Sequence, residues 1–124
     1  MRVWMVAAGA ALVVCGGGEA HAQADREAAF QRVLRQSSEC LIREVSSRVD
    51  AATVTLGDAE RAAVRAATAD ACYIYNAQLA RFTREVHEGT RSLEDVTAAM
   101  QDGSLQLADQ LIGERLAENA ARRK

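Results

Sequence analysis

The chain has 124 residues, of which 15 are basic and 17 acidic, and it contains no proline. This length favours a single domain, and a near-neutral charge with interspersed signs argues against binding to nucleic acid or to an anionic membrane surface. Beyond the terminal Arg122-Arg123-Lys124 no long basic block occurs. The alanine-rich, proline-free composition predicts an all-α protein.

The first two dozen residues have the three parts of a secretory signal peptide. A basic second residue is followed by the apolar run Val3–Val14 and then by small residues, with cleavage positions after Ala22 or Ala24. We therefore expect a signal peptide over residues 1–22 and a single helical domain over residues 23–124. An uncleaved membrane anchor is the alternative, although the apolar run is shorter than the roughly 18 residues that indicate a span.

A lipoprotein anchor is a second alternative. The segment Leu12-Val13-Val14-Cys15 resembles a bacterial lipobox, but Val14 stands where that motif has a small residue before the cysteine. A retained signal or a lipidated Cys15 would hold the protein at a membrane. Without either of them, we expect the protein to be periplasmic or secreted.

Hydrophobic spacing predicts a first helix over residues 25–52. Its apolar residues, such as Val33, Leu41 and Val45, recur mostly three, four or seven positions apart. Residues 53–58 interrupt this pattern, because β-branched residues and a glycine precede acidic residues that suit a helix start. The interruption predicts a turn that sends the chain back along the first helix.

A second helix is expected over residues 58–87, with Gly89 as the left-handed residue that closes it. Its apolar seam has a 3-4-3-4 spacing and consists of Cys72, Tyr75, Leu79, Phe82 and Val86. Tyr73 and Tyr75 flank Ile74 and point to different faces. We expect one ring to pack in the core and the other to reach solvent.

A third helix is expected over residues 93–121, because Ser92 and Asp95 have the Ser-x-x-acid form of a capping box. Its apolar stripe keeps its phase across Gly103, which favours one continuous helix, with a kink at this glycine as the alternative. Together the segments predict a small antiparallel bundle of about three helices, in which the first two form a hairpin.

Cys40 and Cys72 are the cysteines beyond the expected signal peptide, and three roles are open to them. A reactive thiol needs a nearby base or helix start, yet Cys72 falls within a predicted helix and His87 is about four turns away. A tetrahedral metal site needs about four cysteine or histidine ligands, and residues 23–124 supply too few. We therefore expect no catalytic cysteine, no metal and no cofactor.

A disulfide between Cys40 and Cys72 has a geometric argument in its favour. In an antiparallel helix pair, residues equidistant from the turn lie side by side, and the midpoint of 40 and 72 is 56, next to the break at Leu56-Gly57. An exported protein meets an oxidising compartment in which the bond persists. We expect the disulfide to staple the hairpin and to contribute about 3 to 4 kcal/mol in the chain-entropy model.

The third predicted helix carries two apolar strips. At about 100° per residue, the first strip consists of Leu93, Val96, Met100, Leu107 and Leu111. The second strip, Leu105, Ile112 and Leu116, lies well over 90° round from the first, so one hairpin would not easily cover both. We interpret the second strip as a candidate contact surface for another chain, most simply a second copy. A kink at Gly103 that rotates it into the core is the alternative.

No catalytic triad, phosphate-binding loop or zinc-protease motif occurs in the sequence. We therefore expect a non-enzymatic, exported helical protein of the bacterial cell envelope that binds another protein or gives structural support. A membrane-anchored envelope protein is one alternative. A periplasmic small-molecule carrier is another, although alanine-rich helices pack closely and leave little room for a cavity.

Overall fold

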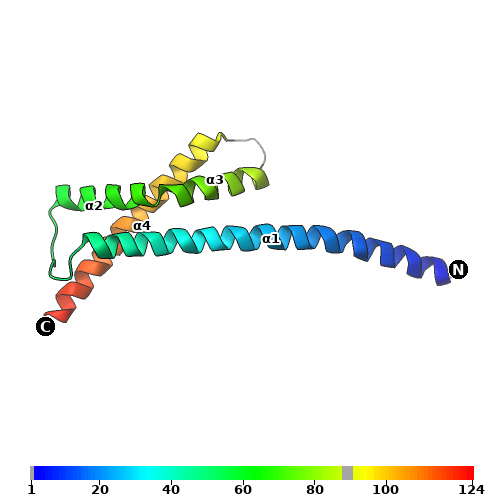
Figure 1. Ribbon diagram of the computed structural model, residues 1–124, viewed down its shortest axis with the longest axis horizontal. Helices are drawn as coiled ribbons and strands as arrows, with labels where there is room; N and C mark the ends of the chain where they lie inside the picture. The colour runs from blue at the N-terminus through cyan, green and yellow to red at the C-terminus, as the bar shows by residue number, and fades with distance from the viewer. Residues whose placement is uncertain (1, 88–90) are drawn as a thin grey trace. The chain divides into compact units, whose positions relative to one another are not determined.

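The computed structural model describes residues 2–87 and 91–124, with side chains described for 20–83 and 91–124. This part of the chain forms four helices and no strand (Figure 1). The helices are α1 (Arg2–Arg48), α2 (Asp58–Ala71), α3 (Tyr73–His87) and α4 (Leu93–Arg122). The prediction of an all-α bundle is confirmed, with four helices in place of three.

The chain divides into two compact units, Met1–Arg32 and Val33–Lys124. The described residues of the first unit all belong to α1, and the second unit contains the rest of α1 together with α2, α3 and α4. The expected cleavage after Ala22 or Ala24 falls within α1 and stays a prediction. Among the described residues, no helix combines the length and the apolar character that a membrane span requires.

The single helix predicted over residues 58–87 is two helices, and this prediction is therefore wrong at Cys72. The backbone of Cys72 has φ −104° and ψ 10°, and its N–H is shared between the carbonyls of Thr68 and Ala69, at 3.3 Å each. The N–H of Tyr75 then bonds to the Cys72 carbonyl at 3.2 Å, which is a tight three-residue turn. Hydrophobic spacing misses such a break because the apolar residues keep their period across it.

The loop over residues 49–57 joins α1 to α2 and forms the turn of the hairpin. It begins earlier than expected, because α1 ends at Arg48 and not at Ala52. After the loop, Asp58 and Glu60 lie in the first turn of α2, where a negative charge is favourable next to the positive end of the helix dipole. The predicted start of this helix is confirmed.

Helix α4 begins at its predicted cap. The Ser92 side-chain oxygen accepts a hydrogen bond from the N–H of Asp95 at 3.1 Å, which satisfies one of the amides that a helix start leaves unpaired. The helix then continues through Gly103, as the phase of its apolar residues predicted. The expected helix closure at Gly89 lies outside the described residues.

Two clusters of buried side chains form the core, and both involve α4. The first cluster contains Val45, Val49, Ile112 and Leu116, with Leu56, Val64 and Leu111 packed against it. The second contains Cys40, Leu41 and Cys72, with Tyr75 and again Leu111 packed against it. Since these residues come from all four helices, α4 packs on a hairpin formed by the end of α1 with α2 and α3.

The buried face of α4 differs from both predicted strips. It consists of Thr97, Ser104, Ala108, Ile112, Leu116 and Asn119. At about 100° per residue this arc begins beside the first strip and includes the second strip. Leu107 from the first strip is accordingly 37% exposed, and Leu105 from the second is half-buried. The sequence prediction relied on the large apolar residues, whereas small or polar residues occupy four of the six buried positions.

The predicted contact surface for another chain is corrected accordingly. Ile112 is 0% exposed and Leu116 is 9% exposed, and both belong to a core cluster with Val45 of α1 and Val49 of the hairpin loop. They reach the core because the buried arc of α4 includes their side of the helix, and α4 continues through Gly103 as one helix. Ile112 and Leu116 therefore stabilise this chain's own fold, and Leu105 is half-buried beside them on the helix.

Candidate functional site

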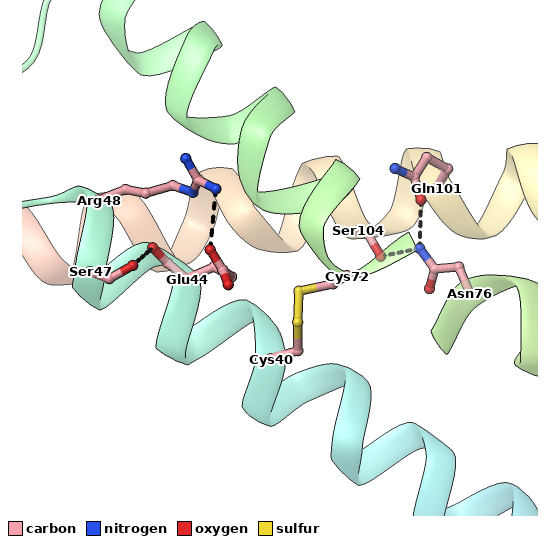
Figure 2. Close-up of a disulfide and its surroundings, with 8 residues drawn as sticks. All are labelled: Cys40, Glu44, Ser47, Arg48, Cys72, Asn76, Gln101 and Ser104. Atoms are coloured by element: carbon pink, nitrogen blue, oxygen red, sulfur yellow. Dashed lines mark hydrogen bonds and ion pairs between the residues drawn. A yellow bond between two sulfur atoms is a disulfide. The ribbon is translucent and has the colours of Figure 1, made fainter. Parts of the chain in front are cut away.

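The centre of the candidate site is the disulfide between Cys40 of α1 and Cys72, the residue between α2 and α3 (Figure 2). The two Cα atoms are 5.9 Å apart, and both side chains are buried. Their cluster includes Leu41, Tyr75 and Leu111, so the bond lies inside the packing of three helices. The pairing predicted from the position of the turn is confirmed.

Exposed apolar side chains flank this buried bond. Ile42 is 52% exposed, Tyr73 50% and Ile74 61%, and each lies within two residues of a bonded cysteine. We call these three residues the exposed flank. Because the disulfide holds the two segments together, the flank is carried by backbone that a covalent bond anchors.

One of the two neighbouring tyrosines is packed and the other is exposed, as the sequence predicted. Tyr75 is half-buried and packs against the disulfide cluster, whereas Tyr73 points to solvent. An aromatic ring that is half-exposed beside an exposed isoleucine keeps a large apolar area in water. Such area stabilises a complex when another protein covers it.

A buried polar contact joins α3 to α4 close to the disulfide. The Asn76 amide is 2% exposed, and its Nδ2 donates to Gln101 Oε1 and to Ser104 Oγ, both at 2.8 Å (Figure 2). A buried amide must find partners, since an unpaired one costs about 1 to 3 kcal/mol. Sequence reasoning missed Asn76, although a polar residue on the buried side of a helical seam is a usable signal for such a contact.

An ion pair joins α2 to α4. Arg61 Nε donates to Asp109 Oδ1 at 2.8 Å, its Nη2 donates to the Asp109 carbonyl at 3.0 Å, and Arg65 lies 3.5 Å from the same carboxylate. The hydrogen bond from Arg61 lowers the pKa of the Asp109 carboxyl against a smaller opposing effect of desolvation, and the same bond raises the pKa of Arg61. All three side chains are a third or more exposed, so water and salt weaken the pair.

The end of α4 binds the hairpin loop through backbone carbonyls. Asn119 Nδ2 donates to the carbonyls of Asp50 at 2.9 Å and Thr53 at 2.8 Å. Arg115 Nε donates to the Val49 carbonyl at 3.2 Å. These bonds give partners to carbonyls of the loop, so they hold the turn of the hairpin and are structural.

A metal centre has no visible ligand set in the described part of the chain, where no three His, Cys, Asp or Glu side chains are grouped to hold an ion. The absence of a cofactor stays a prediction. Comparison with protein-family models, with curated proteins and with solved structures gives no match. The candidate site is therefore defined by the chain's own geometry: a buried disulfide with an exposed apolar flank.

Proposed function

We propose that the protein is an exported, non-enzymatic helical module of the bacterial cell envelope that binds an apolar surface of another protein through its exposed flank. The observation that carries this proposal is the exposure of Tyr73 and Ile74 directly after a buried, covalently anchored cysteine. Anchored backbone loses little freedom when a partner binds, so less of the binding free energy is spent on ordering the site.

The disulfide also supports the proposed location. A buried disulfide persists in an oxidising compartment and is rare in a reducing cytosol. The expected signal peptide would deliver the chain to such a compartment. Together they favour the periplasm or the outside of the cell.

Thiol titration under denaturing, non-reducing conditions tests this location on protein isolated from its native envelope. A chain cleaved after Ala22 or Ala24 has lost Cys15, and with Cys40 bonded to Cys72 it shows no free thiol. An uncleaved chain shows one thiol, and a chain kept in a reducing compartment shows about two or more. Mass spectrometry of the same sample then identifies the first residue, for which we expect Gln23 or Asp25.

Site-specific photo-crosslinking in living cells tests the binding proposal. A photoreactive residue is placed at Ile74 and, as a matched control, at Arg81, which is exposed on the same face of α3 two turns later. We expect a defined protein adduct from position 74 and none from 81. The Tyr73→Ser change should weaken the adduct without altering helical circular dichroism. Equal labelling from both positions, or none from either, would contradict the proposal.

A further inference from the structure

The break between α2 and α3 coincides with the bonded cysteine. Residues 58–87 contain no glycine and no proline, so the usual helix-breaking residues are absent. The departure from helical geometry is confined to Cys72, where the N–H is shared between two carbonyls at 3.3 Å and the next turn tightens. A one-residue departure within a helical stretch calls for a local cause. Two features meet at this residue: its covalent bond to α1 and the packing of Leu111 of α4 against the disulfide cluster.

Contacts with α4 are the competing cause of the break. α2 is held to α4 by Arg61 and Asp109, and α3 is held to α4 by Asn76. A helix that packs along a core curves gently over its length. A departure limited to one residue fits the covalent link at Cys72 better than it fits contacts at Arg61 and Asn76, which are eleven and four residues away along the chain.

We propose that closing the Cys40–Cys72 disulfide creates the break, converting a continuous helix over residues 58–87 in the dithiol chain into α2 and α3. The break sets the direction in which Tyr73 and Ile74, the first two residues of α3, leave the bundle. The oxidation therefore orients the exposed flank. The conformational step stands by itself, and its consequence for partner binding rests on the proposed function.

The oxidation is an ordinary thiol–disulfide exchange with a disulfide oxidant. One cysteine thiolate attacks the oxidant's disulfide, forms a mixed disulfide and releases one oxidant thiol. The second cysteine thiolate then attacks the protein sulfur of the mixed disulfide, closes the Cys40–Cys72 bond and releases the second oxidant thiol. The two protein thiols lose two electrons and two protons, and the oxidant takes up both. Because Cys40 and Cys72 are 2% and 0% exposed in the product, the exchange precedes the final closure of the core.

Nuclear magnetic resonance of the full chain in a Cys15→Ala background tests the proposal, because only the two relevant cysteines remain. One sample is oxidised with glutathione disulfide, and the other carries Cys40→Ala and Cys72→Ala. In the oxidised chain we expect a non-helical Cα shift at Cys72. In the alanine variant we expect helical shifts throughout 58–87 and amide exchange at residues 73–75 that is at least about tenfold slower.

Asn76→Ala with the disulfide intact is the matched control, and we expect the break to persist in it. A break that persists in the alanine variant would overturn the proposal and assign the break to the α4 contacts. An alanine variant without helix over 71–75, or without any fold, would overturn it as well. If the shifts change as expected but a photoreactive residue at position 74 gives no adduct in either form, the proposed function fails while the conformational step stands.

Discussion

The two ends of the buried face of α4 are built differently. Near its start, Thr97 and Ser104 are buried, and Ser104 accepts a hydrogen bond from Asn76 of α3. Nearer its end, Ile112 and Leu116 pack with Val45 of α1 and Val49 of the loop, in an apolar layer that precedes the loop-binding Asn119. Apolar burial contributes free energy in proportion to the buried area and has no preferred direction, so two helices can shift along each other and keep most of it. A buried hydrogen bond contributes less, but it forms only when donor and acceptor face each other. We infer that the apolar stretch around Ile112 and Leu116 contributes most of the stability, and that the polar stretch around Ser104 fixes the alignment of α4 with α3.

Ile112→Ala should have the largest effect, because it removes a fully buried side chain from the apolar end. We expect the free energy of unfolding to fall by about 2 to 5 kcal/mol, measured by urea denaturation. Leu107→Ala is the matched control on the same helix and should cost less than about 1 kcal/mol, since that side chain is 37% exposed. Equal losses would show that the buried face of α4 has been assigned incorrectly.

Replacing both Cys40 and Cys72 with alanine removes the covalent link across 32 residues of chain. We expect the unfolding free energy to fall by about 3 kcal/mol, with helical circular dichroism largely retained because the apolar end remains. Cys15→Ala should leave the melting temperature unchanged. A double variant as stable as the parent would show that the core alone holds the hairpin.

Asn76→Ala tests the polar end and should cost about 1 to 2 kcal/mol. Removing the amide leaves Gln101 and the buried Ser104 hydroxyl without their donor. A double-mutant cycle with Ser104→Ala separates this interaction from general packing, and we expect a clear coupling energy. Strictly additive effects would remove the argument that this contact aligns α3 with α4.

The smallest effect is expected at the ion pair between α2 and α4. Since Arg61 lowers the pKa of Asp109 in the folded chain, the carboxylate stabilises the fold above its unfolded pKa, near 4, and this contribution is lost as the pH falls through the lower folded value. Asp109→Asn should remove this contribution to the fall of the unfolding free energy at low pH, and added salt should make the contribution smaller in the parent chain. Asp102→Asn, an exposed neighbour on α4, is the control. If the unfolding free energy of the two variants depends on pH in the same way, the ion pair between Arg61 and Asp109 is not the source of the acid dependence.

Local chemistry made several features predictable. The absence of proline and the periodic apolar residues gave the all-α class, and the capping pair Ser92 and Asp95 gave the start of α4. The disulfide followed from the symmetry of Cys40 and Cys72 about a turn. Each of these depends on residues close in sequence or on one simple pairing rule.

The missed features depend on contacts between distant residues. Asn76 and Ser104 are 28 residues apart, and Arg61 and Asp109 are 48 apart, so no local pattern pairs them. The rotation of α4 escaped prediction because small buried residues carry no signal in a count of large apolar ones. The break at Cys72 has no local signal, since its neighbours form helix on both sides.

The bonds from α4 to the hairpin loop have a consequence for the order of folding. A chain is synthesised from its amino end, so the loop over residues 49–57 exists before Arg115 and Asn119, which lie 66 to 69 residues beyond their carbonyl partners. Closing a short segment costs less entropy than closing a long one, and distant contacts form slowly. The hairpin should therefore form first with its turn hydrated, and the arrival of α4 should replace that water last.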